Sequence, residues 1–160
     1  MKAIILYDSW YGNTEKLALS LARGLQSKGV YVETIKVNQF EGEDLNEFDF
    51  IAVGGPTHIA GLSKPMKKFL KTVRGSNFQG KMGFAFDTRI ESKFNVFDIN
   101  SAARRIEAAL RRMKVKIIYP RESVLVEGRE GPLVGESEAH FLRLGTVIAE
   151  RLSEIQVASV

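Results

Sequence analysis

The residues from Asp8 to Thr14 combine small hydrogen-bond donors with a glycine, directly before a predicted helix. Ser9 and Thr14 carry hydroxyl groups, Asn13 carries an amide, and Gly12 lets the backbone turn tightly beside a ligand. The first amides of a helix lack intrahelical partners, and the helix dipole attracts negative charge there. The pattern therefore predicts a phosphate-binding turn, with a plain helix-capping turn as the alternative.

Other nucleotide-binding and catalytic classes lack their signatures in this chain. There is no Gly-Lys-Ser/Thr, as in nucleoside triphosphatases, and no G-x-G-x-x-G after the first apolar run, as in dinucleotide-binding proteins. A phosphorylated receiver domain would need an aspartate where the third apolar run meets Gly54-Gly55-Pro56. The absence of cysteine excludes thiol catalysis and Cys-based metal sites. No metal site is predicted.

Short apolar runs alternate with helical periodicity along the whole chain, and these elements must position the turn. Strands are expected at 3–7, 30–37, 50–53, 82–86 and 115–119, the last extended after a bend by 123–126. Helices are expected at 14–27, from Pro65 to Gly75, from an Asn100 or Ser101 cap to Met113, and along Phe141, Leu144, Ile148 and Leu152.

This alternation predicts an α/β fold of three layers, with a doubly wound, five-stranded parallel sheet in the order 2-1-3-4-5. No repeat or linker interrupts it, so residues 1–160 are expected to form one domain. Ligands of such sheets lie beyond the carboxyl ends of the strands, where the strand order reverses. We therefore expect a site made by the loops after the first, third and fourth strands. The charged, glycine-containing loop 127–136 is expected to be mobile surface.

The chain carries 23 Lys and Arg against 19 Asp and Glu, a formal charge of +4. Because the basic residues are spread along the sequence, we interpret them as solvated surface charge, with an anionic partner as the alternative. They form no cluster with interleaved aromatic residues, so no nucleic-acid partner is expected. No apolar run is long enough for a signal peptide or a membrane span, which predicts a soluble, cytoplasmic protein. The oligomeric state stays open.

Two segments resemble motifs of flavodoxin-like proteins. Ser9-Trp10-Tyr11-Gly12-Asn13-Thr14 resembles their phosphate loop, S/T-x-T-G-x-T, but departs from it at Trp10 and Tyr11. Gly54-Gly55-Pro56-Thr57-His58-Ile59-Ala60-Gly61 resembles their G-S/G-P-T-x-x-x-G loop. The order of elements is similar over nearly the whole chain. The resemblance implies a flavodoxin-like fold and a non-covalently bound flavin mononucleotide (FMN).

The resemblance also assigns residues to the cofactor. It implies that Ser9, Asn13 and Thr14 bind the phosphate through side chains, and Tyr11, Gly12 and Asn13 through backbone amides. Pro56–Gly61, including Thr57, His58 and Ile59, would lie along the flavin ring, and Asp87-Thr88-Arg89 would contact its pyrimidine edge, although the Gly-Asp and stacking tyrosine of dedicated carriers are missing. The candidates for stacking on the ring are Trp10, His58 and Phe94.

Several of these residues have a structural alternative. His58 is a candidate proton donor or a surface residue, and Asp87 is a candidate acceptor for a ring N–H. Asp8 is expected to brace its loop. Arg89 and Lys93 would stabilise reduced, anionic flavin if they lie near the ring, and otherwise are solvated charges. His140 is expected at the surface.

The function that follows from the resemblance is electron transfer between redox partner proteins, acidic ones if the basic charge of the chain is complementary to them. An FMN-dependent reductase of quinones or other small acceptors is an alternative, so enzymatic activity stays open. A flavodoxin-like fold that serves only as an interaction module is a further alternative.

Overall fold

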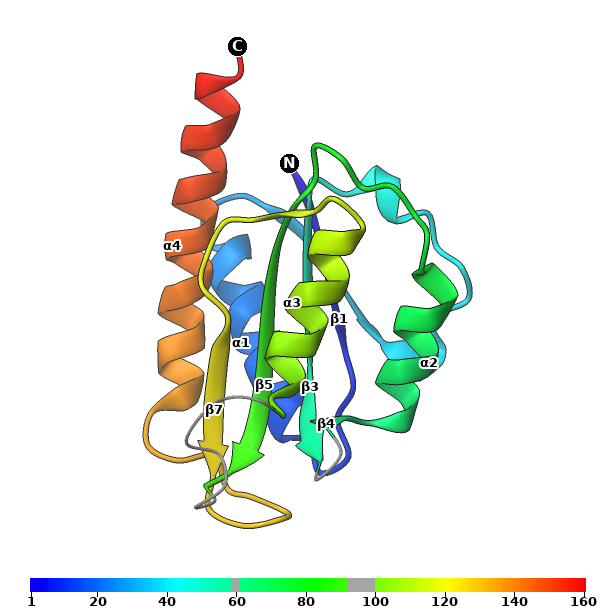
Figure 1. Ribbon diagram of the computed structural model, residues 1–160. Coiled ribbons are helices and arrows are strands. Elements are labelled where there is room, and N and C mark those ends of the chain that lie inside the picture. The colour runs from blue at the N-terminus through cyan, green and yellow to red at the C-terminus, as the bar shows by residue number, and fades with distance from the viewer. Residues whose placement is uncertain (59–60, 92–99) are drawn as a thin grey trace.

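The computed structural model describes residues 1–58, 61–91 and 100–160 and contains one twisted sheet covered by helices (Figure 1). The strands are β1 (Lys2–Tyr7), β2 (Tyr31–Lys36), β3 (Phe50–His58), β4 (Gly61–Leu62), β5 (Met82–Ile90), β6 (Lys116–Ile117) and β7 (Glu122–Val126). The helices are α1 (Asn13–Gln26), α2 (Lys64–Val73), α3 (Ala102–Arg112) and α4 (Ser137–Ala158).

The sheet confirms the predicted order. Its path is β2-β1-β3-β5-β6, with all pairs parallel, while β4 forms a short antiparallel pair with β3. The fifth strand is split, because β6 pairs with the first residues of β5 and β7 pairs with its end. Pro120 lies between the two halves, where its missing N–H cannot join a ladder. Counting β6 and β7 as one strand gives the order 2-1-3-4-5.

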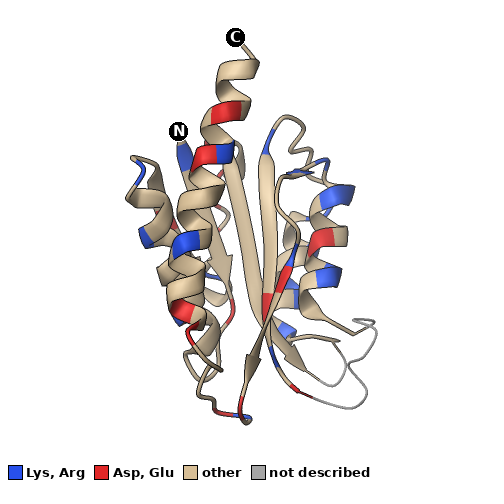
Figure 2. Ribbon diagram, turned by 90° about the vertical axis from the view of Figure 1, so that its left-hand side faces the viewer, with Lys and Arg blue, Asp and Glu red and all other residues tan. Residues whose placement is uncertain are grey.

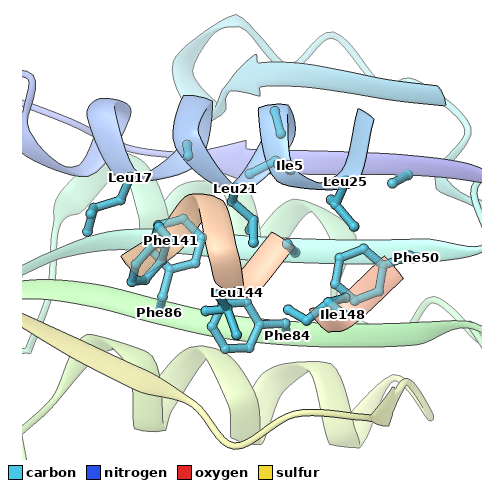
Figure 3. Close-up of a cluster of buried hydrophobic side chains, with 14 of the residues drawn as sticks. Ile5, Leu17, Leu21, Leu25, Phe50, Phe84, Phe86, Phe141, Leu144 and Ile148 are labelled. Atoms are coloured by element: carbon cyan, nitrogen blue, oxygen red, sulfur yellow. The ribbon is translucent and has the colours of Figure 1, made fainter. Parts of the chain in front are cut away.

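Helices α1 and α4 cover one face of the sheet, with a core of large apolar side chains beneath them (Figure 3). Leu17 and Leu21 of α1 meet Phe141 of α4 over the rings of Phe84 and Phe86. None of the helices in the described part of the chain is long and apolar enough to cross a lipid bilayer.

Helices α2 and α3 cover the opposite face, and a serine caps each of them. The Ser63 hydroxyl accepts a hydrogen bond from the Met66 amide, and the Ser101 hydroxyl accepts one from the Arg104 amide. Ser101, rather than Asn100, is therefore the cap of α3. The apolar residues of both helices form a second core cluster with β1 and β3.

Two strands are longer than the sequence predicts. We expected β3 to stop at Gly54 and β5 to end at Phe86, but the pairing continues to Pro56 opposite Thr88. Gly54 does not break the strand, because its missing side chain makes room for the Phe86 ring, which a Cβ there would overlap. The prediction that Asp87-Thr88-Arg89 forms a loop was therefore wrong; these residues lie at the end of β5.

Candidate functional site

The three predicted segments meet around one cavity of about 460 Å³ at the carboxyl ends of β1, β3 and β5. This volume is typical of small-molecule sites. The lining residues that the sequence predicted are Ser9, Trp10, Tyr11, Asn13, Thr14, Pro56, Thr57, His58, Thr88 and Arg89. The doubly wound topology brings them together, since all lie in or directly after the carboxyl-terminal ends of neighbouring parallel strands.

The mouth of α1 lies at this cavity and carries free backbone donors. Gly12 precedes the helix with a φ of 87°, a left-handed conformation that favours glycine, and has no side chain with which to cap the helix. The amides of Tyr11, Gly12, Asn13 and Thr14 donate to no acceptor among the described residues. These amides and the positive end of the helix dipole make a site for an anion.

Hydroxyl groups complete this turn. The Thr14 and Thr88 side-chain oxygens lie 2.8 Å apart, so one hydroxyl donates to the other and the second keeps its proton for a ligand. The Ser9 oxygen accepts from the Glu15 amide at 3.3 Å, which likewise leaves the Ser9 proton free. The turn therefore offers hydroxyl as well as amide donors.

The 127–136 loop, expected to be mobile surface, lies against the 9–14 turn. The Asn13 side-chain amide donates to the Glu130 carbonyl at 3.1 Å. Gly131 approaches Asn13 so closely that a Cβ would come within 2.8 Å of its side-chain amide. Asn13 thus joins the turn to this loop, and one of its two side-chain N–H donors remains for a ligand.

Trp10 and His58 lie side by side at the cavity. Their ring centroids are 5.0 Å apart in an edge-to-face arrangement, and the Trp10 side chain remains 56% exposed. The buried carboxylate of Asp8 accepts hydrogen bonds from the Trp10 indole at 3.1 Å and from the Ser63 hydroxyl at 2.6 Å. Asp8 therefore braces the turn against α2. The Nε2 atom of His58 is buried and has no hydrogen-bond partner among the described residues.

Asp87 points away from the cavity, into the protein. Its carboxylate accepts hydrogen bonds from the Thr57 hydroxyl at 2.9 Å, the Ser101 hydroxyl at 2.6 Å and the Ala103 amide at 2.9 Å. It is fully buried and is not among the cavity-lining residues. All three bonds reach its Oδ2 atom at the N-terminus of α3, where the carboxylate fixes Thr57, while its Oδ1 atom has no hydrogen-bond partner among the described residues. Its role as an acceptor for a ring N–H stays a prediction.

The remaining predicted residues lie elsewhere. Gly61 has a φ of +92° and lies under the Arg105 guanidinium rather than in the cavity wall. The His140 ring shares a 2.7 Å hydrogen bond with Glu122 and is partly exposed. Ile59, Lys93 and Phe94 fall outside the described residues.

Sequence reasoning missed part of the cavity wall. The additional lining residues are Leu62, Ser63, Lys64, Lys67, Ile90, Val126 and Arg129. The helix-start signal at Pro65, directly after the second motif, indicates that the first turn of α2 lies near the site. Nothing in the sequence pattern indicates Arg129, because its place depends on how the 127–136 loop folds back over the turn.

Below the site, the phenol of Tyr7 at the end of β1 donates a 2.8 Å hydrogen bond to Glu15 in the first turn of α1. Burial, reinforced by this hydrogen bond and the negative charge of Glu15, raises the pKa of Tyr7 to about 12. The bond holds the first turn of α1 against the sheet, and thereby the helix mouth in place.

Fold and site together define a doubly wound α/β protein with an open helix N-terminus at the switch point of its sheet. Residues 4–115 match the flavodoxin domain family. The chain is 32% identical to a flavodoxin structure from the domain Archaea, with a TM-score of 0.79 over 96% of this chain and 99% of that one. The chain therefore belongs to the flavodoxin family.

Two groups of curated relatives match the chain over about half of its length. A flavodoxin of Clostridium saccharobutylicum is 36% identical over 89 residues, covering 55% of this chain and 56% of that protein. An NAD(P)H dehydrogenase (quinone) of Cupriavidus metallidurans is 34% identical over 109 residues, covering 53% and 55%. The chain thus spans about half the length of the curated relatives it matches.

Proposed function

We propose that the chain binds FMN non-covalently and carries electrons between redox partner proteins. The observation that carries this proposal is the open mouth of α1. There, four amides that have no acceptor in the described part of the chain and the hydroxyls of Ser9 and Thr14 surround one end of the cavity. Such a donor set matches a phosphate group. Membership of the flavodoxin family supports the same ligand.

The residues present fit FMN along the whole cavity. The 9–14 turn would hold the phosphate, while Trp10 and His58 would lie against the ring system and the orphaned Nε2 of His58 could meet one of its polar atoms. Arg89 would provide positive charge near the ring. When bound, FMN supplies the one- and two-electron redox chemistry, and the protein tunes it.

The charge around the cavity supports acidic redox partners. Lys64, Lys67, Arg89 and Arg129 line the cavity, and no Asp or Glu does so among the described residues. Complementary charge steers partner proteins and raises association rates. A cytoplasmic location and a single 1–160 domain remain predictions.

A reductase of quinones is the second candidate, and the similarity to NAD(P)H dehydrogenase (quinone) proteins favours it. The two functions differ in turnover. A carrier with bound FMN should not oxidise NADH or NADPH in the presence of a quinone, whereas a reductase should do so catalytically.

Addition of FMN to the purified chain tests the proposal. We expect saturation at one FMN per chain, a shifted visible spectrum and quenched flavin fluorescence. Rapid oxidation of NADH or NADPH with a quinone would contradict the electron-carrier function and support the reductase function. If the spectrum remains that of free flavin at high protein concentration, FMN does not bind. Both proposed functions would then be excluded.

A further inference from the structure

The two helices on one face of the sheet are predominantly basic, although Lys and Arg are spread along the whole sequence. Helices α2 and α3 together carry eight Lys or Arg and one acidic residue, Glu107. Helices α1 and α4 on the other face carry acidic and basic residues in equal numbers, and α4 shows both colours in Figure 2. The charge on the α2–α3 face is therefore predominantly positive.

A groove of about 800 Å³ runs between these two helices. Its apolar residues are Leu62, Leu70, Ala108, Ala109 and Met113, and its charged residues are Lys67, Lys71, Arg74, Arg105 and Arg112, with no acidic residue among them. All five cations are exposed. Within the described chain none of them forms an ion pair.

The groove lies next to the cavity at the ends of the strands. Leu62 of β4 and Lys67 of α2 line both hollows, which therefore share a wall. A segment seated between α2 and α3 would therefore end beside the proposed flavin site.

We propose that the α2–α3 groove is the docking site for an acidic, partly apolar segment of the redox partner protein. This inference rests on the proposed electron-carrier function and names its partner surface. Acidic side chains would pair with the five cations, and apolar ones would cover the Leu and Ala residues between them. None of the described residues that line the groove is an aromatic one on which nucleic-acid bases could stack, and its apolar residues favour a protein over a phosphate backbone.

Binding of designed probes tests the groove. The probe is a synthetic amphipathic helical peptide with glutamates on one face and leucines on the other, added to the isotope-labelled, FMN-loaded chain. Its control is the same peptide with lysines in place of glutamates. We expect shifts of the amide resonances of Leu62, Leu70, Ala108 and Ala109, weaker binding at high salt, and at least roughly tenfold weaker binding of the lysine peptide.

Two double variants with the same change of net charge distinguish the effect of the groove residues on peptide binding from the effect of net charge. Lys71→Glu/Arg112→Glu should weaken binding of the acidic peptide roughly tenfold or more and leave FMN affinity unchanged. Lys116→Glu/Arg143→Glu changes the net charge equally at exposed positions outside the groove and should have little effect. Equal effects of the two double variants would overturn the proposal.

Other outcomes would also overturn it: no peptide binding, resonance shifts outside the groove, or tighter binding of a short DNA duplex or of phosphatidylserine-containing vesicles through the same residues. The FMN-free chain distinguishes a failure of the electron-carrier function from a failure of the docking proposal. If FMN does not bind but the peptide still occupies the groove, the electron-carrier function fails while the docking surface stands.

Discussion

The side-chain oxygens of Thr14 and Thr88 lie 2.8 Å apart and join the start of α1 to the end of β5. Both residues are buried beside the cavity. One short contact thus couples the 9–14 turn to the strand that carries Arg89.

Replacement of Thr14 by Val should weaken FMN binding, because it removes a hydroxyl donor and the partner of Thr88. The expected loss is about 1–3 kcal/mol in a fluorescence-quenching titration. Thr14→Ser keeps the hydroxyl and should bind nearly as the parent chain does. An unchanged dissociation constant for Thr14→Val would show that this side chain does not contact the phosphate.

Reversal of charge at Arg89 should lower the reduction potential of bound flavin, because a positive charge near the ring favours the reduced, anionic form. A potentiometric titration of Arg89→Glu should show a shift on the order of tens of millivolts. Arg143→Glu, on α4 and away from the cavity, provides the matched control. A potential that is the same in both variants would place the Arg89 charge too far from the ring to act on it.

Much of the site could be predicted from the sequence, because strand-to-helix turns are encoded locally. The 9–14 turn needs only its glycine, its small donors and the following helical periodicity, and the structure places it at the cavity. The inward direction of Asp87 could not be predicted, since it depends on Ser101 and the N-terminus of α3, which the fold brings in from elsewhere. The basic α2–α3 face likewise appears only when separate helices meet.

The two glycines at the centre of β3 should differ in their tolerance of a side chain. A Cβ at Gly54 would overlap the Phe86 ring, so Gly54→Ala should lower the free energy of unfolding by about 1–3 kcal/mol. At Gly55 the added methyl group would meet only the flexible end of Met66, at 3.3 Å, and should cost less. Urea denaturation of the two variants gives the comparison. Equal losses would contradict the packing explanation for the extended strand.

The Tyr7–Glu15 hydrogen bond predicts a loss of stability at alkaline pH. The fold raises the pKa of Tyr7 from its ordinary value of 10.0 to about 12. The stabilisation is therefore fully present below pH 10 and is lost as the pH rises toward 12. In urea unfolding, Tyr7→Phe should be less stable at neutral pH by about 1 kcal/mol and should decline less steeply above pH 10.

Tyr31→Phe is the control for this measurement, because the Tyr31 phenol is exposed and bonds only to Glu33 on its own strand. It should change the stability little at neutral pH. An alkaline decline as steep in Tyr7→Phe as in the parent chain would assign that decline to other groups.

The most direct test of the account compares the affinities of FMN and riboflavin, which differ only in the phosphate. If the free amides and hydroxyls of the 9–14 turn bind that group as proposed, FMN should bind at least roughly a hundredfold more tightly. Equal dissociation constants for the two flavins would contradict the assignment of this turn as the phosphate site.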